Sequence, residues 1–118
     1  MDGIMKANRI AKCLDDKKGR DIAILNISDI TTIGDYFVIA SASSAPQIKA
    51  MADEVLEKMH EQGYDPIHIE GYSTATWILL DYGDVIVHVF HDETRSFYGI
   101  ERLWTDAVKV EYISQEKL

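Results

Sequence analysis

Residues 76–90, TWILLDYGDVIVHVF, constrain the fold more than any other part of the chain. Two runs of apolar and β-branched residues flank Gly83-Asp84, a pair that is typical of the two-residue turn between antiparallel strands. Alternation along the first run gives two sets of side chains on opposite sides: Trp77, Leu79 and Asp81, and Ile78, Leu80 and Tyr82. Both sides carry large apolar groups, so this hairpin needs cover on both faces.

The segments before the hairpin predict two helices and three further strands. Ile4, Ala7, Ala11 and Leu14 recur at helical spacing, and this first helix ends at Gly19. Residues 21–28, 34–43 and 67–71 are rich in β-branched and aromatic residues between turn formers, and they are predicted strands.

The second helix has the clearest signals. Ser44 and Gln47 form a capping-box pattern, Pro46 fits the first turn, and Gly63 ends the helix. Its apolar face is predicted to consist of Ile48, Met51, Ala52, Val55, Leu56 and Met59.

A last helix is predicted to be capped by Asp92 and to run through Arg95 and Phe97 toward Trp104. The expected fold is therefore α/β (α+β): a single domain over residues 1–113 with a mixed five-stranded sheet and flanking helices. Residues 114–118 are expected to form a loose tail.

The charge balance narrows the possible partners. The chain of 118 residues has 12 Lys and Arg against 20 Asp and Glu, a net charge of −8. It lacks the broad basic surface that gripping a phosphate backbone requires, which argues against direct binding of nucleic acid. An acidic domain favours basic partners instead. Cys13 is the only cysteine, and no apolar run suits a signal peptide or a membrane span, so we expect a cytoplasmic protein.

Two patterns invite a chemical interpretation. His88 and His91 resemble a metal pair, but residues three apart on a strand point to opposite faces, so no metal site is expected. The turn at Gly34-Asp35 is similar to one that opens nucleotidyl-transfer sites, yet the following strand has no acid, and Asp81 and Asp84 straddle a turn. We expect no catalytic residues and no cofactor, and a nucleotide-handling enzyme is the weaker hypothesis.

A surface role accounts for more of these residues. Trp, Tyr and Arg are enriched at interface hot spots, and Trp77, Tyr82, Arg95 and Tyr98 gather around the hairpin and the helix after it. Cover by a helix of the same domain is the alternative explanation. The sequence does not decide which face of strand 76–82 a partner would use.

The run GYSTATWILLDYGDVIVHVFHDETRSFYGIERLW, with GDYFVIASASSAPQIKAMADEV upstream, resembles the Iojap family of ribosomal silencing factors. The similarity extends from about Ile4 to Tyr112. Its most specific elements are Trp77, Leu79-Leu80, Asp81-Tyr82-Gly83-Asp84, Arg95, Phe97-Tyr98 and Leu103-Trp104.

The resemblance implies a nucleotidyltransferase-like domain without catalytic carboxylates. It also implies binding to the large ribosomal subunit through its fourteenth protein, a basic protein at the subunit interface. Bound there, the protein would block joining of the small subunit and repress translation when nutrients are scarce. Organellar relatives assist assembly of the large subunit, which is an alternative role.

Carried onto this chain, the resemblance gives an expected partner-binding set: Trp77, Leu79, Leu80, Asp81, Tyr82, Arg95 and Tyr98. Exposed apolar groups around the hairpin also make a homodimer of the free protein an expectation.

Overall fold

The structure is a computed structural model that describes residues 1–98, 108–110 and 112. Its elements, in chain order, are α1 (Gly3–Asp16), β1 (Arg20–Asn26), β2 (Tyr36–Ala42), α2 (Ala45–Glu61), β3 (His68–Glu70), β4 (Trp77–Asp81), β5 (Val85–His91), α3 (Asp92–Tyr98) and β6 (Val108–Val110). The helices and strands predicted before residue 92 are all present. None of the described helices is long and apolar enough to cross a membrane.

The strands form one mixed sheet in the order β3-β4-β5-β2-β1-β6. Among the described strands, β2 and β5 run parallel and the other neighbouring pairs are antiparallel. The α+β class and the mixed sheet are confirmed, but the predicted number of five strands is wrong, because β6 adds a sixth. It pairs with β1, with Val110 opposite Ile24. Three residues with a lysine in the middle carry too little pattern to predict a strand.

The end of the chain differs from expectation in a second respect. Asp92 was predicted to cap the last helix, but it is the first residue of α3. The Nδ1 atom of His91 accepts the backbone N–H of Glu93 at 3.2 Å, while Asp92 forms an ion pair with Arg20 at 3.0 Å. The predicted continuation of this helix toward Trp104 and the tail at 114–118 lie outside the described residues.

The predicted N-cap of α2 is confirmed, while the side chain of Gln47 donates to the backbone carbonyls of Lys17 and Lys18. Ser44 is the N-cap, and its Oγ accepts the N–H of Gln47 at 3.3 Å. After the helix, Gly63 adopts a φ of +88°, which a residue with a side chain rarely takes. The predicted apolar positions of α2 are buried, except that Leu56 is only partly buried.

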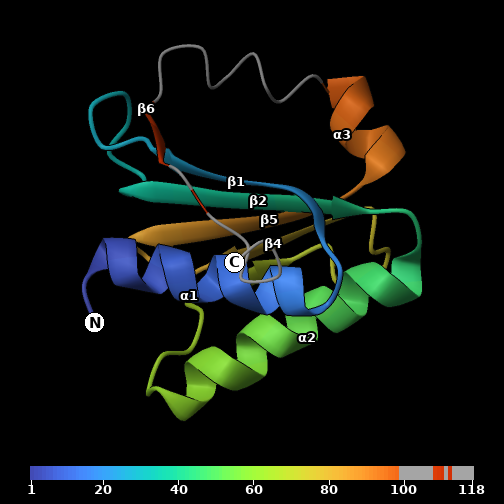
Figure 1. Ribbon diagram of the computed structural model, residues 1–118, viewed down its shortest axis with the longest axis horizontal. Helices are drawn as coiled ribbons and strands as arrows, with labels where there is room; N and C mark the ends of the chain where they lie inside the picture. The colour runs from blue at the N-terminus through green and yellow to red at the C-terminus, as the bar shows by residue number, and fades with distance from the viewer. Residues whose placement is uncertain (99–107, 111, 113–118) are drawn as a thin grey trace.

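One face of the sheet packs against α1 and α2, which lie side by side beneath it in Figure 1, while α3 lies above it. This proximal face holds the main core, which includes Ile10 and Leu14 of α1, Met51 and Val55 of α2, and Val87 of β5. Burial of these side chains against the two helices is the principal stabilising contribution to the domain.

The opposite side of the sheet is here called the distal face. Cross-strand pairs share a face, so the register assigns to it the trios Trp77, Phe90 and Ser41; Leu79, His88 and Ile39; and Asp81, Ile86 and Phe37. A second, smaller core lies on this side, formed by Leu25, Ile27, Ile39 and Phe90 with Phe37 and Trp77 packed against it. The central strands therefore bury apolar groups on both faces, as the hairpin sequence requires.

The loop between β3 and β4 offers a test of this arrangement. Gly71 has a φ of +77°, and a Cβ atom there would collide with the carbonyl oxygen of Trp77. Gly63 is a matched control, because its φ is +88° and a Cβ there meets nothing within 4 Å. We expect Gly63→Ala to cost about 1 kcal/mol from backbone strain alone, and Gly71→Ala to cost at least roughly 2 kcal/mol. Urea unfolding measures both, and equal costs would contradict the close approach of the two strands.

Candidate protein-binding site

The alternating side chains of β4 divide between the two faces. Trp77, Leu79 and Asp81 lie in a row on the distal face, and all three are half-buried. Leu80 and Tyr82 lie on the proximal face, where 0% and 8% of their surface is exposed. The side chains of β4 that remain partly accessible therefore lie on the distal face.

Arg95 is also buried, with 8% of its surface exposed. Its Nη1 atom donates to the carbonyl oxygen of Asp21 at 2.9 Å and to Oγ of Ser41 at 3.2 Å. These bonds attach α3 to the start of β1 and to the end of β2. Tyr98 ends α3, but its side chain lies outside the described part of the chain.

Of the seven residues predicted to bind a partner, the structure therefore brings three together at an accessible surface. Leu80, Tyr82 and Arg95 hold the strands and α3 in place, and a buried side chain offers a partner little surface. The motif is continuous in sequence, whereas strand geometry sends its alternate residues to opposite sides. Whether any of the seven contacts a partner stays a prediction.

His88 lies in the middle of the distal face, opposite Leu79 on one side and Ile39 on the other. Its Nδ1 atom accepts a hydrogen bond from the indole Nε1 of Trp77 at 3.1 Å. The ring of Phe37 meets it edge-on, with centroids 4.7 Å apart, and the ring of Phe90 is stacked nearly parallel at 6.0 Å. His88 thus fixes the orientation of Trp77.

Burial lowers the pKa of His88 to about 4, so its imidazole is neutral at pH 7. Its Nε2 atom is buried and has no hydrogen-bond partner. His91 is engaged by the backbone of α3, and no group of three or more potential metal ligands exists among the described residues. The hydrogen bond between His88 and Trp77 could not be inferred from the spacing of these residues in the sequence.

The distal face continues into β3, which is an edge strand. His68 and Glu70 lie beside Asp81 and Leu79, and His68 Nε2 is 2.8 Å from Glu70 Oε1. Large apolar side chains are exposed around the same edge: Ile67 at 75%, Ile69 at 44% and Tyr72 at 37%. This corner of the molecule combines exposed apolar area with carboxylates, a composition that suits contact with another protein.

The carboxylates considered for phosphate chemistry are engaged in structural contacts. Asp81 Oδ1 accepts the N–H of Gly83 at 2.7 Å, whereas Asp84 forms an ion pair with Lys6 of α1 at 3.1 Å. The backbone carbonyl of Asp84 accepts the N–H of Asp35 at 2.8 Å. These contacts stabilise the hairpin and join it to α1 and to the start of β2.

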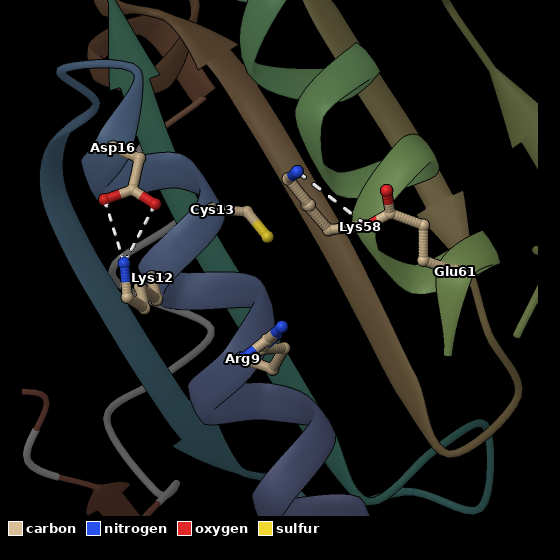
Figure 2. A pocket seen from close by; sticks show the side chains of 6 residues that line it. All are labelled: Arg9, Lys12, Cys13, Asp16, Lys58 and Glu61. Atoms are coloured by element: carbon tan, nitrogen blue, oxygen red, sulfur yellow. Dashed lines mark hydrogen bonds and ion pairs between the residues drawn. The ribbon is translucent and has the colours of Figure 1, made fainter. Parts of the chain in front are cut away.

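Two further hollows are lined by residues within the described part of the chain. Figure 2 shows the first, a groove of about 190 Å³ between α1 and α2, where Lys12 pairs with Asp16 and Lys58 with Glu61. Cys13 lies beside this groove, and burial raises the pKa of its thiol to about 11, so the thiol stays protonated.

The second hollow, about 430 Å³, lies at the ends of the parallel strands β2 and β5, where open α/β sheets often bind ligands. Four of its polar side chains are paired with one another, through the Arg20–Asp92 ion pair and the Arg95–Ser41 hydrogen bond. Neither hollow presents a group prepared for catalysis.

These features define a class: a small α+β domain with a mixed sheet, two helices on one face and a second, smaller core that contains aromatic rings on the other. Within that class, the chain belongs to the family of ribosomal silencing factors. The family model described as "Ribosomal silencing factor during starvation" matches residues 2–118. The resemblance found in the sequence is thereby confirmed.

Individual relatives agree with this assignment. The ribosomal silencing factor of Halalkalibacterium halodurans is 44% identical over 98 residues, which cover 83% of this chain and 84% of that protein. A crystal structure of a protein from Chromobacterium violaceum is similar with a TM-score of 0.83 at 36% identity, covering 95% of this chain and 92% of the other.

A more distant relative comes from an organelle. The Mus musculus protein named "Mitochondrial assembly of ribosomal large subunit protein 1" is 33% identical over 100 residues, covering 81% of this chain and 43% of that protein.

The buried imidazole predicts a pH dependence of stability. The pKa of His88 is about 4 in the folded protein and about 6.5 in an unfolded chain, so between these values the unfolded chain binds more protons. The contribution of the neutral His88 to stability is therefore almost fully present above pH 6.5, and it is lost as the pH falls toward 4. The surrounding rings of Trp77, Phe37 and Phe90, with Leu79 and Ile39, carry no ionisable group.

We expect His88 to remove about 2 kcal/mol from the free energy of unfolding between pH 7 and pH 5. Urea unfolding at the two pH values measures the loss. In His88→Asn that part of the pH dependence should disappear, and an unchanged dependence in the variant would contradict this assignment.

Proposed function

We propose that this protein represses translation by binding the large ribosomal subunit through its fourteenth protein and blocking the joining of the small subunit. Its family membership supports a role at the ribosome. We base the proposed binding surface on one observation: Trp77, Leu79 and Asp81 lie in a row on the distal face, beside an exposed edge strand.

The apolar part of this surface has the character of an interface. Trp77 is half-buried, and its ring packs against that of Phe90 with centroids 4.8 Å apart and planes tilted by 32°. It also donates a hydrogen bond to His88, so its ring is already ordered before a partner arrives. Ordered aromatic side chains lose little conformational entropy on binding and are frequent hot spots. Leu79 adds apolar area next to it. We assign the principal contact to these two residues.

The charges on this surface suit the proposed partner. Glu70 and Asp81 are the carboxylates on the distal face of β3 and β4, and the whole chain carries a net charge of −8. The fourteenth protein of the large subunit, as the family resemblance implies, is basic. Opposite charges raise the association rate and select the partner, while the apolar residues contribute most of the binding free energy.

The other members of the expected set have different places in this proposal. Leu80, Tyr82 and Arg95 hold β4 and α3 in place, so their effect on binding is indirect. Tyr98 remains a proposed contact. Exposed Ile67, Ile69 and Tyr72 favour self-association of the free protein, and this supports the expected homodimer.

Assistance in large-subunit assembly is a second candidate function, favoured by the similarity to the mouse protein named for that process. In the assembly role the protein would bind the same large subunit, but it would act while that subunit is being assembled and not when the two subunits join. A nucleotide-handling enzyme is the third alternative, and it predicts no stoichiometric binding to ribosomal subunits.

Leu79→Ala tests the proposed surface. We expect it to weaken binding to isolated large subunits by at least about 1 kcal/mol, or roughly fivefold, because it removes apolar contact from the centre of the site. Co-sedimentation at moderate salt without nucleotide gives the affinity. Ile33→Ala is the matched control, because Ile33 is 61% exposed and lies in the loop between β1 and β2. Equal affinities of the two variants would place the interface elsewhere.

If the protein blocks subunit joining by steric exclusion, its effect depends on whether it is added before or after the subunits join. The molecule extends 34 Å along each principal axis, which is too wide for the gap between two docked ribosomal surfaces. Protein added to separated subunits should prevent their association, whereas protein added to joined ribosomes should act slowly, limited by spontaneous dissociation. Light scattering follows both reactions. Joined ribosomes that carry the protein stably and in stoichiometric amount would refute exclusion and favour the assembly role.

A further inference from the structure

The sheet ends in two edge strands that differ in their side chains. Among the described strands, β3 and β6 each have a neighbour on one side only. An edge strand turns the N–H and C=O groups of alternate residues outward, where another chain can pair with them. β6 has Lys109 at its centre, a residue type that protects edges from such pairing, whereas β3 has Ile69 at its centre. β3 is therefore the edge that is open to a further strand.

The side of β3 that faces the helices is apolar and accessible. Ile69 lies opposite Leu80 and shares the proximal face with it, but Ile69 is 44% exposed, whereas Leu80 is fully buried. Ile67, two residues earlier, is 75% exposed and extends this apolar side. The cover that buries the proximal face of β4 therefore does not reach across β3, and an added strand would find apolar side chains to pack against.

The other side of β3 is acidic. Glu70 lies opposite Leu79 on the distal face, and His68 lies opposite Asp81. His68 Nε2 is 2.8 Å from Glu70 Oε1, but an ionised carboxylate has room for several donors. Cationic side chains on an added strand would meet the carboxylate of Glu70, with that of Asp81 one strand further in.

We infer that the partner protein docks by adding a short extended segment to the edge of β3, with apolar side chains toward Ile67 and Ile69 and lysine or arginine side chains toward Glu70. This inference rests on the proposed function and deepens it, because it names the form in which the basic ribosomal protein is recognised. In such docking, main-chain hydrogen bonds contribute affinity, and the alternating side chains select the partner.

Three further observations favour this occupant. The net charge of −8 suits a basic segment. Pro66 has no N–H to donate, and Gly71 turns the chain with a φ of +77°, so pairing is confined to residues 67–70. β3 also pairs directly with β4, so one partner could contact this edge and the row that contains Trp77 and Leu79.

Hydrogen–deuterium exchange tests the pairing in the wild-type protein. With isolated large subunits in excess, we expect backbone amides of residues 67–70 to exchange at least roughly tenfold more slowly than in the free protein, because new hydrogen bonds protect them. The amides of β6 are the control within the same chain, and their exchange should not change. Unchanged exchange in β3, or an equal slowing at both edges, would overturn the inference.

A lysine placed in β3 tests the same edge by substitution. Ile69→Lys gives β3 the central residue that β6 has, and it should weaken co-sedimentation with large subunits at least roughly tenfold. Ile30→Lys is the matched control, because Ile30 is 46% exposed and lies in the loop between β1 and β2. It should stay within about twofold of wild type. Circular dichroism reports whether both variants are folded, and equal affinities of the folded variants would refute the edge contact.

The outcomes distinguish this inference from the function on which it rests. If wild-type protein fails to co-sediment with large subunits, the proposed function is refuted, and the inferred partner with it. If it co-sediments but exchange in β3 is unchanged, the function stands and the inference is refuted. Protection of β3 that rises with the concentration of the free protein, and rises no further with large subunits, would assign the edge to a second copy of this chain and also overturn the inference.

Discussion

The burial of apolar side chains on both faces of β5 is the constraint on which the rest of this structure depends. All residues from Val85 to Phe90 are buried, so the strand must lie in the interior of the sheet with material on either side. Pairing β5 in parallel with β2 and antiparallel with β4 places it there. Helices α1 and α2 then cover one face of the central strands, and the other face holds a smaller cluster of rings and aliphatic groups.

The sequence predicts the elements whose signals are local. The Gly83-Asp84 turn, the Ser44 cap of α2 and the apolar face of that helix all depend on residues within a few positions of one another, and the structure confirms them. β6 was missed because its existence depends on pairing with β1, which is more than eighty residues away in sequence. Short strands are stabilised by their neighbours, and their own composition says little.

The candidate site, too, could be predicted only in part from local sequence signals. Alternation along residues 77–82 divides the motif into two sets, but only the positions of α1 and α2 decide which set is accessible. Arginine is a residue type that is frequent at protein interfaces, but the guanidinium of Arg95 donates hydrogen bonds within the domain, to Asp21 and Ser41. The resemblance to a family identifies residues that matter, and burial then separates those that can meet a partner from those that hold them in place.

Trp77 combines two roles: it packs in the second core, and it presents accessible surface at the proposed interface. A fully exposed tryptophan would contribute apolar area but would lose conformational freedom on binding, and a fully buried one would offer a partner nothing. Trp77 lies between these limits: the Phe90 ring supports it, the His88 ring fixes its indole N–H, and part of its surface remains accessible. The second core of the sheet therefore does more than stabilise the fold, because the contacts that complete it also set the orientation of the aromatic group at the centre of the proposed interface.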